Sequence, residues 1–184
     1  MSLVLPSSYL GPVSHYRALY HAEEAKVEVY DHYCKQTFRN RCCIDSPNGS
    51  LSLSIPVEKI VGHALLKDVR ISDHGNWRHQ HWNALVSSYR QTPFFEFYAD
   101  DFRPFYEKKW TFLADFNEEL MQLVCRLLDI GTPFSRTTEY TPFELTEEDT
   151  KPYYQIFASR HGFIPNLSIV DLLFNMGPEG ILYL

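Results

Sequence analysis

The hydrophobic period of this chain changes along its length, from the alternation of β-strands to the spacing of amphipathic helices. Residues 51–57 alternate between apolar and polar side chains, with Leu51 on the inward face, and Asn48-Gly49 just before them is typical of a tight hairpin turn. Residues 111–131 instead repeat apolar side chains at helical spacing. A chain with strands first and helices later is expected to have an α/β or α+β fold.

Shorter segments complete the expected order of elements. A buried strand at 3–6, a helix at 15–25 and an alternating strand at 26–31 give a βαβ-like start. The C-terminal half is expected to be mainly helical, with one aromatic helix broken at Pro104. The whole chain, 1–184, is expected to form a single domain. Further strands are expected at 37–44, 68–72 and 134–140, helices at 76–91 and 93–106, and an acidic surface loop at 144–151.

Charge and composition exclude several classes of function. A net charge of −6 and a pI near 5.7 argue against binding to nucleic acid or to anionic membranes. No run of 18 apolar residues is present, so no membrane span is expected, and the first ten residues lack the basic flank of a signal peptide. We therefore expect a cytoplasmic protein, with aromatic residues that leave room for a homodimer face. The cysteines match no zinc or disulfide spacing and are expected to be buried free thiols: Cys34, Cys42, Cys43 and Cys125.

A short apolar helix near the end of the chain carries a polar stripe made of Ser168, Asp171 and Asn175. Ser168 is a good N-cap. The carboxylate of Asp171, three residues later, is placed to pair with the cap residue and to interact with the positive end of the helix dipole. Asn175 lies among large apolar residues, where an unpaired amide costs about 1–3 kcal/mol. The stripe therefore either holds the helix end or forms one wall of a binding site.

Three cations lie within seven residues of an otherwise acidic chain: Lys35, Arg39 and Arg41. On a strand, Arg39 and Arg41 would share one face, and two guanidinium groups suit a phosphate or carboxylate. Asn40 would face the opposite side. The alternative is an edge strand on which charge prevents aggregation.

Three histidines, His74, His79 and His81, lie within eight residues, but their spacing does not suit a metal. His81 shares the apolar face of its helix with Trp77 and Leu85. It is either a core histidine or a general acid/base, since a half-buried imidazole titrates near neutral pH. No motif in the sequence indicates which cofactor, if any, the protein uses.

The loop between the first strand and the first helix contains Tyr9, Gly11 and His15. The start of a helix after a strand offers free N–H groups to an anion. This strand–loop–helix pattern resembles that of nucleotidylyltransferases, although only one histidine is in place. The alternative is a Pro-rich turn with an exposed His15.

Four segments in order, 5–16, 33–57, 77–95 and 162–179, resemble the motifs of the WbqC-like protein family: its N-terminal Tyr/Pro loop, its N-R…N-G…P-V block, its W-x-x-x-H…Y helix and its closing signature. Two departures are Leu5 in place of the usual Gln and a short polar segment at 140–152. The family motif positions are occupied by Tyr9, Asn40, Arg41, Asn48, Gly49, Trp77, His81, Tyr89, Asp171 and Asn175.

The resemblance implies a role in O-antigen or other surface-polysaccharide synthesis, where a glycine or aminoacyl transferase activity has been suggested. The leading hypothesis is a transferase with a small-molecule donor and a sugar or glycan precursor as acceptor, and with His81 or Asp171 as the base. The alternatives are a non-catalytic scaffold protein of that pathway and a nucleotidylyltransferase-like enzyme that uses His15. The ligand-binding residues would be Tyr9, Arg39, Asn40, Arg41 and Asn175.

Overall fold

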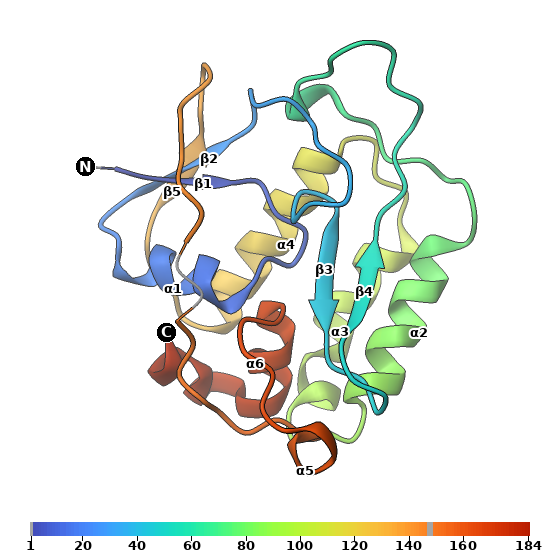
Figure 1. Cartoon of the computed structure of the whole chain (residues 1–184), viewed down its shortest axis with the longest axis vertical. Helices are drawn as coiled ribbons and strands as arrows, with labels where there is room; N and C mark the ends of the chain where they lie inside the picture. The colour runs from blue at the N-terminus through green and yellow to red at the C-terminus, as the bar shows by residue number, and fades with distance from the viewer. Residues whose placement is uncertain (1, 147–148) are drawn as a thin grey trace.

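A parallel sheet and an antiparallel hairpin organise the fold (Figure 1). The structure is a computed structural model that describes residues 2–146 and 149–184. Strands β1 (Leu3–Pro6), β2 (Ala25–Glu28) and β5 (Phe134–Arg136) pair in parallel in the order β1-β2-β5. Helix α1 (Val13–His21) connects β1 to β2, so the βαβ-like start and the mixed fold class are confirmed. Residues 147 and 148 of the predicted acidic loop lie outside the described residues.

The predicted hairpin is formed by β3 (Arg41–Ile44) and β4 (Leu51–Ser54). Gly49 takes a positive φ of 105° in the connecting loop. Three expectations were wrong. The loop between the two strands covers residues 45–50 and is longer than the expected tight turn. Leu51 is 39% exposed at the loop end of the ladder, although Ile44, its partner across the ladder, is fully buried. Residues 37–40 form a turn in place of a strand, since the carbonyl of Thr37 accepts the amides of Asn40 and Arg41.

The helices of the second half follow the predicted spacing with one correction. The predicted break at Pro104 does not occur; the carbonyl that this residue leaves without an amide belongs to exposed Asp100, which water can reach. The strand predicted at 68–72 is also wrong, because Asp68 is the last residue of a 3-10 helix and Arg70 and Ile71 each form an isolated bridge. The elements are η1 (Leu66–Asp68), α2 (Trp77–Tyr89), α3 (Phe95–Glu107), α4 (Leu113–Leu127), α5 (Ala158–His161), α6 (Ile169–Met176) and η2 (Gly177–Tyr183).

Helix α4 lies between the parallel sheet and the hairpin in Figure 1, and its apolar stripe joins both to one hydrophobic core. The stripe is buried as predicted, except for the partly buried Leu127. Gly177 follows the last residue of α6 with a φ of 58°, and a Cβ added there would lie 2.5 Å from the Phe94 ring, so the position has no room for a side chain. This close packing draws α6 against the start of α3.

Candidate functional site at the carboxyl edge of the parallel sheet

A cavity of about 400 Å³ opens beside the carboxyl end of β1, and we call it the arginine cavity. Open α/β sheets bind their ligands at the carboxyl ends of parallel strands. Pro6, the last residue of β1, contributes to its wall, and the rest comes from the turn before β3, from β3 itself and from a segment after β5. The lining residues are Pro6, Gln36, Thr37, Phe38, Arg39, Arg41, Cys43, Phe143 and Leu145.

The two arginines of this cavity differ in how far their charge is already neutralised. Arg39 forms an ion pair with Asp31 and donates to Thr37 Oγ1 at 3.3 Å. Arg41 donates from Nε to Ser54 Oγ at 3.1 Å and has no ion pair within the described residues. The prediction that both lie on one strand was wrong, yet turn and strand bring them to the same cavity. Arg41 is the cation available to an anionic ligand.

His81 holds the end of β4 from helix α2. Its Nε2 lies 3.1 Å from the carbonyl oxygen of Ser54, so Nε2 carries the proton and Nδ1 accepts from Tyr9 Oη at 2.9 Å. Tyr106 Oη lies 2.8 Å from Tyr9 Oη and continues the chain of hydrogen bonds. Burial lowers the pKa of His81 to about 4, so the expected titration near neutral pH is wrong. Ser54, fixed in this way, presents its hydroxyl to Arg41.

Tyr89, two turns further along α2, holds the other end of the hairpin. Its hydroxyl accepts the amide of Asp45 at 3.0 Å, just after β3, and donates to Asp171 Oδ1 at 2.8 Å. His81 and Tyr89 therefore clamp both ends of the hairpin to one helix. The W-x-x-x-H…Y spacing places these two side chains on the same face.

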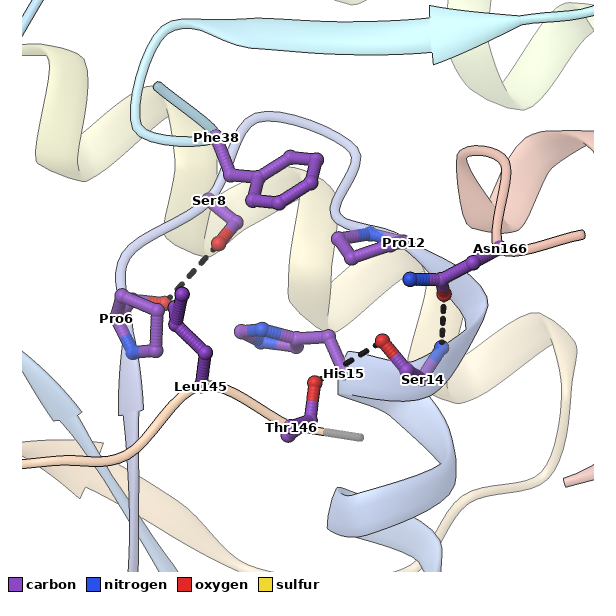
Figure 2. A pocket seen from close by; sticks show the side chains of 9 residues that line it. All are labelled: Pro6, Ser8, Pro12, Ser14, His15, Phe38, Leu145, Thr146 and Asn166. Carbon is purple, nitrogen blue, oxygen red and sulfur yellow. Dashed lines mark hydrogen bonds between the residues drawn. The ribbon is translucent and has the colours of Figure 1, made fainter. Parts of the chain in front are cut away.

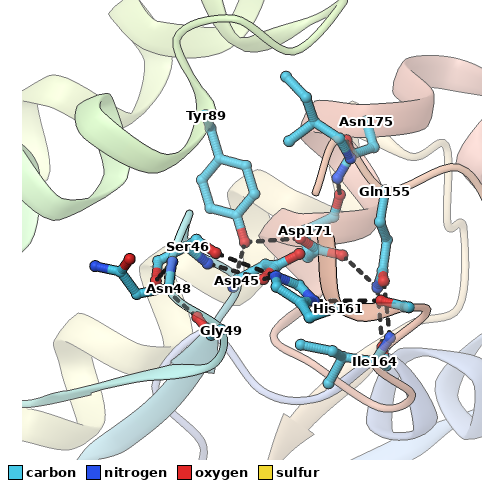
Figure 3. Close-up of polar contacts among 12 residues, drawn as sticks. Asp45, Ser46, Asn48, Gly49, Tyr89, Gln155, His161, Ile164, Asp171 and Asn175 are labelled. Carbon is cyan, nitrogen blue, oxygen red and sulfur yellow. Dashed lines mark hydrogen bonds and ion pairs between the residues drawn. The ribbon is translucent and has the colours of Figure 1, made fainter. Parts of the chain in front are cut away.

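Asp171 is buried and accepts three side-chain hydrogen bonds, as Figure 3 shows in part. Besides Tyr89, its donors are Tyr153 at 2.7 Å and Gln155 at 2.9 Å. Burial raises the pKa of Asp171, and its three donors lower it; the net result is a pKa raised to about 6. The expectation that Asp171 answers the N-cap was wrong, because its carboxylate turns into the core. Ser168 alone caps the helix, accepting from the amide of Val170 at 3.4 Å.

Asn175 satisfies its buried amide with backbone groups. Its Nδ2 donates to the carbonyl of Asp171 at 2.7 Å, and its Oδ1 accepts the amide of Ile156 at 3.1 Å. The polar stripe of α6 thus holds the segment before α5 and the end of α2. Arg41 instead bonds Ser54 on the hairpin.

A second buried carboxylate, Asp45, lies beside this stripe and was missed in the sequence (Figure 3). It is 0% exposed; Oδ1 accepts the amide of Ser46 at 2.8 Å and lies 3.1 Å from Nε2 of His161. Burial raises the pKa of Asp45, and His161 lowers it. No local pattern marks Asp45, because its partner follows 116 positions later.

Asn40 turns away from the arginine cavity. Its Nδ2 donates to the carbonyl of Ile55 at 3.0 Å, while its buried Oδ1 has no hydrogen-bond partner among the described residues. The carbonyl of Arg39 accepts from Asn117 at 2.9 Å, and the carbonyl of Phe38 accepts the amide of Tyr9 at 2.8 Å. These bonds fix the turn that presents Arg39.

A small cavity of about 40 Å³ lies next to the arginine cavity and shares Pro6, Phe38 and Leu145 with it. Figure 2 shows the imidazole of His15 directed into this space. His15 is 3% exposed, and burial lowers its pKa to about 4, so the expected exposed histidine is wrong. Its full lining is Pro6, Ser8, Pro12, Ser14, His15, Phe38, Leu145, Thr146 and Asn166.

Protein groups already occupy the first turn of α1, where an anion site was expected. The amide of Val13 donates to the carbonyl of Leu167 at 2.9 Å, and that of Ser14 donates to Asn166 Oδ1 at 3.0 Å. A phosphate would have to displace both. This arrangement does not support nucleotide binding at His15.

Residues 2–146 and 149–184 were compared with what a metal site and a membrane span require. That part of the chain has no group of His, Cys, Asp or Glu side chains arranged to hold a metal ion. None of its helices combines the length and apolar character that crossing a membrane requires. Cys42 and Cys125 are buried thiols as expected, whereas Cys34 is exposed and Cys43 lines the arginine cavity.

Comparison with known proteins agrees with the motifs. The family model described as the WbqC-like protein family matches residues 8–151, more than half of the chain. The chain belongs to the WbqC-like protein family. It is also similar to the uncharacterized protein Rv1507c of Mycobacterium tuberculosis (strain ATCC 25618 / H37Rv), with 27% identity over 205 residues that cover 85% of this chain and 86% of that protein. No solved structure matches significantly.

The WbqC-like family match contains the whole arginine cavity except Pro6, together with both clamps from α2. It ends before α6, so Asp171 and Asn175 lie outside the matched residues. Of the predicted site residues, Arg39 and Arg41 line the cavity. Tyr9 and His81 meet in one buried network and Asp171 and Asn175 in another, while Asn40 faces Ile55.

Proposed function

We propose that this WbqC-like protein is a group transferase that acts on a sugar or glycan precursor of surface polysaccharides. The observation that carries the proposal is the side chain of Arg41, which lines a cavity of about 400 Å³ without an ion pair to the described residues. A guanidinium group binds a phosphate through charge-assisted hydrogen bonds. The donor is therefore a molecule that carries a phosphate, diphosphate or carboxylate.

The other walls of the cavity suit the remainder of such a donor. Phe38, Phe143 and Leu145 form an apolar surface next to the arginines. Binding sites for small molecules combine apolar and aromatic walls with a few well-placed polar groups. A nucleotide sugar fits this combination, with its diphosphate on Arg41 and its base against an aromatic ring.

The catalytic roles of His81 and Asp171 stay predictions. Asp171 has a pKa of about 6, close to that of a working base, but neither residue lines the arginine cavity. In this proposal Asp171 holds Tyr89 at one end of the hairpin, and His81 positions Ser54, which orients Arg41.

A non-catalytic binding protein of the same pathway is the second candidate. The described residues that line the arginine cavity include no carboxylate and no imidazole, so neither of the commonest kinds of general base contacts its ligand there. The two candidates differ in turnover. A transferase converts a bound nucleotide sugar in the presence of an acceptor, whereas a binding protein leaves it unchanged in a mass-spectrometric assay.

Binding is tested by calorimetric titration with UDP, UDP-glucose and inorganic pyrophosphate. We expect Arg41→Ala to weaken binding ten- to a hundredfold, since a hydrogen bond to a charged group contributes about 1.5–3 kcal/mol. Arg126→Ala is the matched control, because Arg126 is exposed on α4 and outside the cavity. Equal affinities of Arg41→Ala and wild type would contradict the proposal. So would the absence of binding by all three compounds.

A further inference from the structure

A second cavity, of about 570 Å³, lies at the carboxyl ends of β2 and β5, and we call it the acidic cavity. Its walls come from residues 30–32 and 138–140, which lie one residue beyond the ends of these two parallel strands, and from Leu65 before η1. It therefore shares the functional edge of the sheet with the arginine cavity. The lining residues are Tyr30, Asp31, His32, Leu65, Thr138, Glu139 and Tyr140.

Buried Glu28, the last residue of β2, fixes both walls of the acidic cavity. Its Oε1 accepts the amide of Tyr30, and its Oε2 accepts the amide of Thr141 at 2.7 Å. Glu28 is 1% exposed. Thr137 ties the same two strand ends together, since its Oγ1 accepts the amide of Val29 at 3.3 Å. The cavity is thus preorganised by side chains that it does not itself expose.

The acidic cavity has the opposite charge to its neighbour. Asp31 and Glu139 line it, and its lining contains no lysine or arginine from the described part of the chain. Glu139 has no ion pair within the described part of the chain. The ring of Tyr30 already contacts one cation of the chain, with Lys67 Nζ 5.5 Å from its centroid. Such walls favour a ligand that brings positive charge and hydrogen-bond donors.

One ion pair forms the boundary between the two cavities. Asp31 lines the acidic cavity, and its partner Arg39 lines the arginine cavity. Ligands in the two cavities would therefore approach each other at this pair. An anionic donor on one side and a cationic or hydroxylated acceptor on the other would each meet walls of complementary charge.

We propose that the acidic cavity is the acceptor site and that it binds a hydroxylated amine of the amino-sugar type. The ammonium group binds the carboxylate of Glu139, and the hydroxyl groups bind Thr138 and Tyr140. The role of this cavity as the acceptor site rests on the proposed transferase function, whereas the recognition of an amine rests on the cavity alone.

The test is a ligand-observed NMR titration of the full chain with D-glucosamine, with D-glucose as the uncharged analogue. We expect glucosamine to bind and glucose to bind at least tenfold more weakly. Glu139→Gln should weaken glucosamine binding at least tenfold and leave UDP binding unchanged. Glu107→Gln is the matched control, because Glu107 is an exposed carboxylate at the end of α3 outside both cavities.

The outcomes separate this inference from the proposed function. Glucosamine affinity that is absent in wild type, or unchanged in Glu139→Gln, overturns the acidic cavity as an amine site. Loss of UDP binding in Arg41→Ala alone, with glucosamine binding intact, supports two separate sites. If UDP and pyrophosphate fail to bind wild type while glucosamine binds through Glu139, the donor proposal fails and the amine site stands.

Discussion

Two buried polar networks hold helix α2 against the β3–β4 hairpin, and they differ in charge. The His81 network consists of Tyr106, Tyr9, His81 and the carbonyl of Ser54. The Asp171 network consists of Asp45, Tyr89, Tyr153, Gln155 and Asp171. The first contains neutral groups in a simple chain. In the second, the hydroxyl of Tyr89 donates to the carboxylate of Asp171 and accepts the backbone amide of Asp45, whose own carboxylate is also buried.

The difference shows two ways to bury polar groups beneath a binding site. In the His81 network each hydrogen atom has an acceptor, and burial keeps the imidazole neutral by lowering its pKa to about 4. In the Asp171 network three donors offset the burial of a charge, and the pKa of Asp171 still rises to about 6. A neutral network is tolerant of losing one bond, whereas a charged one depends on all its donors.

The largest effect is expected from Asp171→Ala. This change leaves the hydroxyls of Tyr89 and Tyr153 and the amide of Gln155 without their acceptor. We expect the free energy of unfolding to fall by about 3–4 kcal/mol and the melting temperature by roughly 10 °C. Urea unfolding followed by tryptophan fluorescence measures it. A loss below about 1 kcal/mol would show that the hydrogen bonds only balance the burial of the charge.

The sequence reveals these networks in part, and the reason lies in distance along the chain. Periodicity places His81 and the α6 stripe on buried faces, because each face repeats within one element. It does not reveal that Tyr9 contacts His81 from 72 residues away, or that Tyr89 reaches Asp171 across 82. The depth of burial, and so the pKa of His81, depends on such distant partners.

The candidate site was predictable to the same extent. The two arginines can be recognised in the sequence, because they are closely spaced cations in an acidic chain. The position of Arg39 could not be predicted, because the carbonyl of Thr37 accepts two amides and forms a turn. The alternation of apolar and polar residues does not indicate such a turn. Phe143 and Leu145 complete the cavity from a segment whose composition indicated only a polar loop. The fold class, in contrast, follows from local periods that each element carries by itself.

Acid should affect the two networks in opposite directions. The pKa of His81 is about 4 in the folded chain and 6.5 ordinarily, so the unfolded chain binds the proton first. Its contribution to stability falls by about 3 kcal/mol as the pH drops from 6.5 to 4. Buried His15 adds a fall of the same sign. Asp171, with a pKa raised to about 6 from 3.8, binds a proton first in the folded chain and contributes a rise over that range.

Chemical denaturation of matched variants between pH 7 and pH 4 checks these opposite signs. His81→Gln should lose less stability over this range than wild type, because no imidazole remains there to be protonated. Asp171→Asn should lose more, because the offsetting proton uptake is gone. The comparison uses slopes against pH, so a constant loss of stability in either variant does not affect it. Parallel slopes in all three proteins would contradict the assignment of these groups.

The smallest effect comes from removing one hydroxyl in each network. Tyr153→Phe takes a donor from an ionised carboxylate, and we expect a loss of about 2 kcal/mol in the free energy of unfolding. Tyr106→Phe removes a bond between two neutral hydroxyls, and we expect the free energy of unfolding to fall by about 1 kcal/mol at most, the usual value for such a bond. Tyr98→Phe is the control, since that hydroxyl makes no hydrogen bond to the described residues.

At pH 4, below the pKa of about 6, Asp171 is protonated in the folded chain, and the bond from Tyr153 no longer ends on a charge. The cost of Tyr153→Phe should then approach that of Tyr106→Phe, because both become bonds between neutral groups. Urea titrations of the two variants at pH 7 and pH 4 measure the convergence. If the gap between them persists at pH 4, the strength of the Asp171 network comes from its packing and not from its charge.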